Sequence, residues 1–238
     1  MKKLSLGLAL VVLGAATGAA FARGGDRPVV AVAEFTNQTA AGWWSGGVGW
    51  ELSGMLSNEL SSSGDFKVVE RNKIQNVLEE QNLTASGRVR SGTGPRIGKL
   101  TGAQYLITGT VTSYQENTAS TGGGLSFRGI SLGGKQSEAY LGIDLRVINL
   151  ETGDVDFSRT VEGRSKGGGV SVGLYRGGFG GNLAHEEKTP AGKAIRGALV
   201  EATDYLDCVM IKRDGCIDEF RRKEQHRRDG DRKALDLD

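Results

Sequence analysis

The chain has 238 residues, of which 30 are Lys or Arg and 28 are Asp or Glu, so its formal net charge is +2. This length is enough for one sizeable core, and a second domain is not required. The near-neutral balance gives no electrostatic reason to expect a nucleic-acid partner.

The first 22 residues have the pattern of a secretory signal peptide. Lys2 and Lys3 precede an apolar run, and the sequence AFA at residues 20–22 forms a cleavage site. The apolar run is too short to span a bilayer comfortably. We therefore expect an exported protein whose mature chain starts near Arg23. No cysteine stands at the cleavage site, so we expect no lipoprotein anchor there.

The next part of the chain alternates between strand and helix patterns. The apolar run VVAVAEF at residues 29–35 predicts a buried strand. A helix follows, with one apolar stripe at Val48, Leu52, Met55, Leu56 and Leu60. A second strand is predicted at residues 66–70. Asn72 and Gln75 resemble a capping box for a second helix, whose buried face is expected at Ile74, Val77 and Leu78.

The middle of the chain has the pattern of two long strands. A short helix is expected at residues 96–101, before a strand at residues 103–115. Another strand is predicted at residues 138–150, where apolar and charged side chains alternate. The turn ETGD at residues 151–154 then sends the chain back as an antiparallel strand.

A final helix completes the pattern of the mature chain. Thr189 is the expected N-cap and Pro190 the first helical residue. The tail from Asp218 onward is dense in charges of both signs, which indicates a solvated helix that frays into disorder. The order of elements predicts an α+β fold, with helices packed on a mixed β-sheet.

Two glycine-rich segments interrupt the predicted sheet, at residues 117–136 and at residues 164–186. A transmembrane β-strand needs about nine to eleven residues, so each segment has the length of one membrane-crossing hairpin. The alternative is a pair of surface loops, which the glycine content alone favours.

The cysteines and histidines carry little chemistry of their own. Cys208 and Cys216 flank a turn signal at residues 214–215, so they either form a disulfide or remain one buried and one exposed thiol. His185 and His226 have no partner at a useful spacing, and no catalytic or phosphate-binding motif is present. We expect no enzyme, no cofactor and no metal site.

Several motifs occur in the order of a known family. They are "VAVAEFTNQTA", "LSGMLSNELSSSGDFKVVERNKIQNVLEEQNL", "GKLTGAQYLITGTVTSY" and "LRVINLETGDV". Between residues 29 and 210 the chain thus resembles the curli secretion channel family, of the CsgG/HfaB type. The residues that carry the first motif are Phe35, Asn37, Gln38 and Thr39.

This resemblance implies an outer-membrane channel subunit that passes unfolded polypeptide. An α/β domain at residues 23–210 would form a ring in the periplasm, ahead of a charged tail at residues 211–238. The two glycine-rich segments would be hairpins in a shared transmembrane β-barrel. The implied partners are further copies of the chain, a secreted unfolded polypeptide, the outer membrane and periplasmic accessory proteins.

The family also places a constriction loop after its first strand. In this sequence the loop is "QTAAGWWSGGVG", and Trp43 and Trp44 are its candidate constriction residues. They could instead pack against a neighbouring subunit or the sheet edge. The alternative function is a soluble periplasmic binding or scaffold protein of the same fold, without a pore.

Overall fold

The computed structural model describes residues 27–120, 126–127, 130–131, 135–166 and 189–235. The signal peptide, the middle of the first glycine-rich segment and nearly all of the second lie outside these residues.

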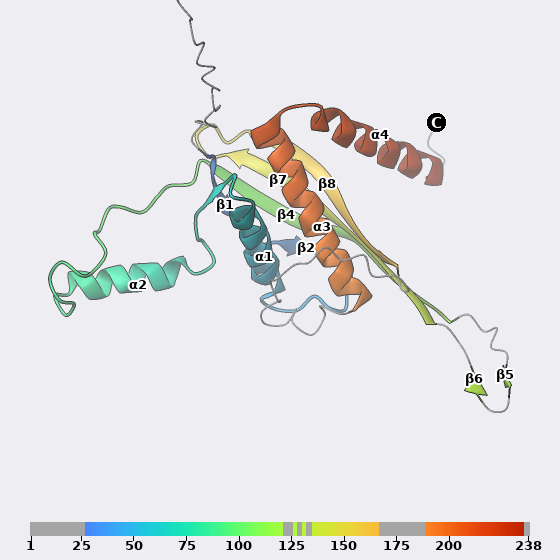
Figure 1. Ribbon diagram of the computed structural model, residues 1–238, viewed down its shortest axis with the longest axis horizontal. Helices are drawn as coiled ribbons and strands as arrows, with labels where there is room; N and C mark the ends of the chain where they lie inside the picture. Colours follow the sequence, from blue (N-terminus) through green and yellow to red (C-terminus); the bar gives the residue numbers. More distant parts are fainter. Residues whose placement is uncertain (1–26, 121–125, 128–129, 132–134, 167–188, 236–238) are drawn as a thin grey trace, which may run out of the picture.

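The chain forms a mixed sheet with helices, which confirms the α+β prediction (Figure 1). The first elements are β1 (Val29–Val32), β2 (Thr36–Asn37), α1 (Val48–Ser63), β3 (Lys67–Val68), α2 (Ile74–Ala85) and β4 (Tyr105–Ser120). They are followed by β5 (Ser126–Phe127), β6 (Ile130–Ser131), β7 (Lys135–Asn149), β8 (Val155–Lys166), α3 (Pro190–Asp207), the π-helical turn η2 (Cys208–Lys212) and α4 (Cys216–Ala234).

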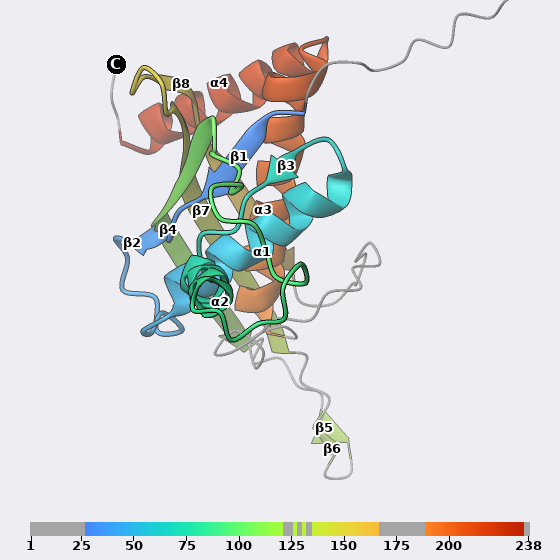
Figure 2. The same ribbon diagram turned by 90° about the vertical axis from the view of Figure 1, so that its left-hand side faces the viewer.

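The main sheet has the strand order β3-β1-β4-β7-β8, and β2 pairs with β4 beyond the end of β1. Strand β1 is parallel to β3 and β4, whereas β4, β7 and β8 are antiparallel to one another. Helices α1 and α3 lie together against one face of this sheet (Figures 1 and 2). The largest fully buried side chains of this core are Phe35, Phe66, Leu52, Leu56, Leu60, Ile107, Leu141, Ile143, Leu145, Ile195 and Leu199.

Three strands continue beyond the helices as a ribbon (Figure 1). The last pair between β2 and β4 joins Asn37 to Val111. The β4–β7 ladder runs on from there to the pair of Ser120 with Lys135. The β7–β8 ladder reaches the pair of Glu138 with Lys166. Both glycine-rich segments therefore start from the same end of the same sheet.

Helix α2 stands away from the sheet as an arm, together with the chain that follows it (Figures 1 and 2). The prediction of a buried face is wrong, because Val77 and Leu78 are each 37% exposed. The capping box is also wrong: Lys73 is the N-cap, and its backbone N–H donates to Oε1 of Glu70 at 2.9 Å. No helix forms at residues 96–101, where Gly98 adopts a left-handed conformation that interrupts helical geometry.

The two C-terminal helices, α3 and α4, can be compared with what their sequences predict. Thr189 caps α3 by accepting a hydrogen bond from the N–H of Gly192, and Pro190 opens the helix, as predicted. Helix α4 is largely exposed, as the prediction of a solvated helix requires, but one of its side chains is not. Its Phe220 is buried, and the ring lies 5.4 Å from that of Tyr205 on α3. An aromatic contact of this kind gives a highly charged helix a point of attachment to the core.

Candidate functional site

The loop between β2 and α1 begins with a network made by the predicted family motif. Oδ1 of Asn37 accepts hydrogen bonds from both the N–H and the hydroxyl of Thr39, each at 2.8 Å. Nδ2 of Asn37 donates to the carbonyl oxygen of Thr39. The N–H of Gln38 donates to the carbonyl of Val111 on β4, which fixes the start of the loop against that strand. These contacts give Asn37, Gln38 and Thr39 structural roles at the start of the loop.

Phe35 connects the start of this loop to β4 and to α1. Its ring is buried over Gly109 of β4, where an added Cβ atom would lie 1.6 Å from Cε1 of Phe35. Its backbone N–H donates to the carbonyl of Gly49 in the first turn of α1. Phe35 therefore contacts β4 through its ring and α1 through its backbone N–H.

The two tryptophans predicted for the constriction pack together at the base of the ribbon. The rings of Trp43 and Trp44 are 5.6 Å apart, and Trp43 meets Tyr114 of β4 edge-on, also at 5.6 Å. Both indoles are partly buried against the core, and Nε1 of Trp43 has no hydrogen-bond partner among the described residues. In a single chain these side chains thus pack beside the sheet, at the point where β4 leaves the body.

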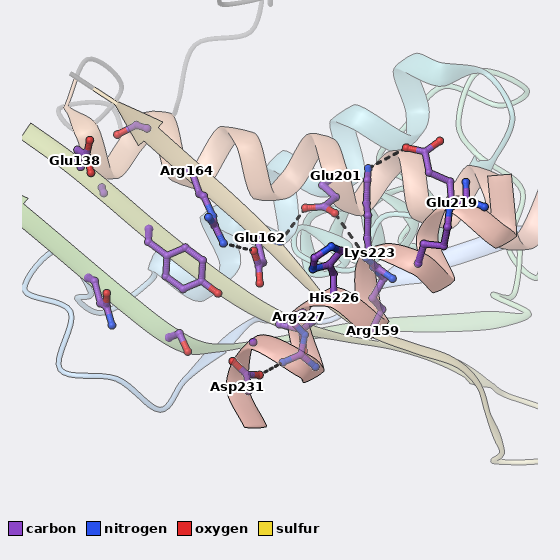
Figure 3. Close-up of a pocket in the computed structure, with 18 residues that line it drawn as sticks. Glu138, Arg159, Glu162, Arg164, Glu201, Glu219, Lys223, His226, Arg227 and Asp231 are labelled. Carbon is purple, nitrogen blue, oxygen red and sulfur yellow. Dashed lines mark hydrogen bonds and ion pairs between the residues drawn. The ribbon is translucent and has the colours of Figure 1, made fainter. Parts of the chain in front are cut away.

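A second feature, a groove of about 1210 Å³, lies between α4 and the strands β7 and β8 (Figure 3). Helix α4 contributes Lys223, His226 and Arg227 to it. The strands contribute carboxylates and arginines, and α3 contributes Glu201 (Figure 3). The sequence does not predict this groove, because its residues come from distant segments without a shared motif.

Arg159 of β8 fastens α4 to the edge of the sheet. Its side chain is only 7% exposed, and Nη1 donates to the carbonyl of Phe220 at 2.6 Å. The guanidinium lies 5.6 Å from the ring centre of Tyr205 and 5.0 Å from that of Phe220. Its charge is balanced by Glu201, whose Oε1 is 3.9 Å from Nη2. Contacts of a guanidinium with aromatic rings, like those with Tyr205 and Phe220, stabilise it when it is removed from water.

Glu201 also closes part of the outer edge of β8. Its Oε2 accepts a hydrogen bond from the backbone N–H of Glu162 at 3.0 Å. The hydroxyl of Tyr205 donates to the carbonyl of Ser158, which precedes Glu162 by four residues on the same strand. Side chains of α3 therefore satisfy edge groups that another strand would otherwise pair with.

The strand wall and the α4 wall of the groove each contain their own polar pairs. Burial and the adjacent carboxylate of Glu162 raise the pKa of Tyr140 to about 12. Glu162 also accepts a hydrogen bond from Arg164 at 2.9 Å. On α4, burial opposes ionisation of Glu224, but hydrogen bonds from Arg227 and Arg228 outweigh it and lower the pKa of this carboxyl. These pairs form within each wall of the groove, which indicates a structural role for its charges.

The connection between α3 and α4 is covalently closed. Cys208 and Cys216 form a disulfide with their Cα atoms 6.0 Å apart. Between them, Arg213 adopts the left-handed conformation, with φ of 50°. The α3–α4 corner is thus fixed by the disulfide, by this turn and by Arg159.

Comparison with known families identifies the class of protein. The chain matches the family model described as "Curli production assembly/transport component CsgG" over residues 18–235. The chain belongs to this family, and the resemblance seen in the sequence is confirmed.

Individual relatives are more distant. CsgG of Escherichia coli strain K12 is 29% identical over 105 residues, which are 42% of this chain and 38% of that protein. The chain therefore matches well under half the length of this curated relative. The "Putative lipoprotein NMB1126/NMB1164" of Neisseria meningitidis serogroup B is 27% identical over 189 residues, 76% of each chain.

Two solved structures are similar in part. Hypothetical protein CT253 of Chlamydia trachomatis is 12% identical, and the match covers 78% of this chain and 99% of that one with a TM-score of 0.45. The PelC dodecamer from Paraburkholderia phytofirmans is 19% identical, with 59% and 72% covered and a TM-score of 0.31. Among the described residues, no helix has both the length and the apolar character to cross a membrane.

Proposed function

We propose that this chain is a subunit of a non-catalytic outer-membrane secretion channel that passes unfolded polypeptide. The family membership supports this role. In this proposal, residues 117–136 and 164–186 are hairpins of a shared β-barrel, and the α/β body forms a ring of identical copies facing the periplasm.

The ribbon of β4, β7 and β8 is the observation that carries the proposal. A barrel must hydrogen-bond all of its backbone groups within the hydrocarbon, so its strands have to be paired before they enter. Here the ladders are already formed at Ser120 with Lys135 and at Glu138 with Lys166. Both glycine-rich segments would therefore extend an existing antiparallel sheet, in register, from one end of the body (Figure 1).

Trp43 and Trp44 support a constriction at that same end. Their loop lies at the base of the ribbon, where Trp43 contacts Tyr114. In a ring, one pair of indoles from each copy would surround the axis of the pore. The rings would contact an extended polypeptide and exclude folded domains.

Alkaline carbonate extraction of cell envelopes tests membrane insertion. We expect the untagged mature protein to remain in the membrane pellet and the variant Val172→Asp to be released. A lipid-facing Lys or Arg costs about 2–4 kcal/mol at the bilayer centre, and a carboxylate costs less but still opposes insertion. The matched control is Ser171→Asp, whose side chain would face the lumen.

A detergent wash separates membrane insertion from aggregation, because detergent dissolves inserted protein and leaves aggregates behind. Release of the unmodified protein by carbonate would contradict the channel. It would instead favour a soluble periplasmic binding or scaffold protein of the same fold.

A further inference from the structure

The α2 arm, defined as residues 74–100, exposes an apolar surface that its own chain leaves uncovered. Five of the eight large hydrophobic side chains exposed in the described residues belong to it: Val77, Leu78, Leu83, Ile97 and Leu100. Ile97 is 63% exposed and Leu100 is 49% exposed. Exposed apolar surface gathered in one place is typical of an interaction site.

The arm also needs a partner in order to be stable. Helix α2 has 12 residues, and Gln81 is its one buried residue. Helices of this length are marginal in water unless an apolar face packs on something. Both views show that no other helix or strand covers α2 (Figures 1 and 2). A surface that covers and stabilises the arm would come from outside the described chain.

The charge of the arm restricts what that surface can be. The helix of the arm carries the exposed Glu79 and Glu80, whereas the loop that follows carries Arg88, Arg90, Arg96 and Lys99 and no acidic residue. All four cations are exposed, and none is ion-paired with another described residue. The complementary surface would be apolar at its centre and acidic at its rim.

The turn between β7 and β8 has these properties. Leu150 and Val155, which are both 48% exposed, are two of the three remaining exposed hydrophobics. They are flanked by exposed Glu151, Asp154 and Asp156. We call residues 150–156 the turn patch. The arm and the turn patch thus match in both apolar character and charge, and together they hold seven of the eight exposed large hydrophobics.

We propose that the α2 arm of one copy docks on the turn patch of the next copy. The arm and turn of a single chain do not cover each other, because these exposures are those of the chain with its own arm present. A contact between two different surfaces is head-to-tail, and its repetition closes into a ring when the rotation between copies allows it. The inference rests on the ring of the proposed function and names its subunit interface.

Charge reversal tests the pairing. Arg96→Glu with Lys99→Glu reverses the arm, and Glu151→Lys with Asp154→Lys reverses the turn patch. Size-exclusion chromatography with light scattering, on the mature chain in detergent, measures assembly. We expect each double variant to associate at least about 10-fold more weakly, because like charges then face each other. An equimolar mixture of the two variants should assemble again, since alternating copies bring the arm of one variant onto the oppositely charged turn patch of the other.

The mixture distinguishes a contact between copies from a contact within one chain. A contact within one chain would be restored only in a variant that carries all four substitutions. The matched control is Arg232→Glu with Lys233→Glu, two exposed cations in the last turn of α4 that carry the same change of charge. Circular dichroism and thermal melting verify that each variant is folded.

Three outcomes decide the matter. Loss of assembly in both reversed variants, recovery in the mixture and an unaffected control support the inference. Normal assembly of the reversed variants, equal loss in the control or no recovery in the mixture overturns it and leaves the proposed ring intact. If the unmodified chain does not assemble at all, both the inference and the proposed ring fail.

Discussion

Phe35 and Gly109 show how much of this molecule depends on single contacts. The aromatic ring occupies the space that any side chain at position 109 would need. Phe35 in turn bonds to Gly49, where an added Cβ would lie 2.3 Å from the carbonyl oxygen of Phe35. Phe35 therefore contacts the sheet through its buried ring and the first turn of α1 through its backbone. The loop that carries the two tryptophans lies between these fixed points.

Gly109→Ala should destabilise the protein by about 2 kcal/mol or more, because overpacking a filled core forces its side chains and backbone to move. Urea unfolding of the mature chain measures the change. Gly102→Ala is the matched control, since an added Cβ there meets nothing within 4 Å. Shortening Phe35 to Ala should make the Gly109 substitution much less costly, as expected for residues in contact. Equal midpoints for Gly109→Ala and the unmodified protein would contradict this account.

The corner between α3 and α4 is the element on which the groove depends. Helix α4 is rich in charge, and Phe220 is its one buried residue. Its position comes from the disulfide, the left-handed turn at Arg213 and the clamp of Arg159 on the carbonyl of Phe220. Without these constraints a helix of this composition has little apolar surface to hold it on the sheet.

Replacing Cys208 and Cys216 by serine should lower the free energy of unfolding by about 2.5 kcal/mol, from the entropy regained by the unfolded chain. The cysteines are separated by eight positions, so the loop that they close is short. Denaturant unfolding with and without a reductant measures the effect. The reductant should destabilise the native chain and leave the serine variant unchanged. If the reductant destabilised the native chain and the serine variant equally, its effect would not come from the disulfide.

At the scale of the whole molecule, the described body has three surfaces aimed outward. The ribbon leaves one end, the tryptophan loop lies at the base of that ribbon, and the α2 arm projects away from the sheet (Figure 1). Each of these surfaces has backbone or apolar groups that further copies of the chain could contact. An assembly of copies would use all three, with arms between neighbours and indoles around a central opening.

Trp43→Ala with Trp44→Ala should raise the single-channel conductance of the reconstituted protein in planar bilayers, since the pore would widen at its narrowest ring. Trp50→Ala is the control, because this third tryptophan lies within α1. The thermal midpoint should be compared as well, given that Trp43 packs on Tyr114. Unchanged conductance in an assembled, folded double variant would assign the pair to packing alone.

Several elements could be read from local patterns. The stripe from Val48 to Leu60 and the Thr189-Pro190 start of α3 depend on neighbours within a few residues, so both helices form where the sequence predicts them. The return of β8 along β7 likewise follows from a short turn and alternation. The capping box at Asn72 failed because Glu70, outside the expected motif, accepts the bond from Lys73.

The sequence by itself determined the order of helices and strands, the apolar faces and the family, because these depend on spacing along the chain. Only the tertiary structure decided what each face meets. The apolar side of α2 looks like core in the sequence yet lies exposed, whereas Phe220 sits in a charged helix yet is buried. Burial is a property of contacts between distant segments. Arg159, Glu201 and Phe220 are 42 and 19 positions apart along the chain, and only folding brings them together at the edge of β8.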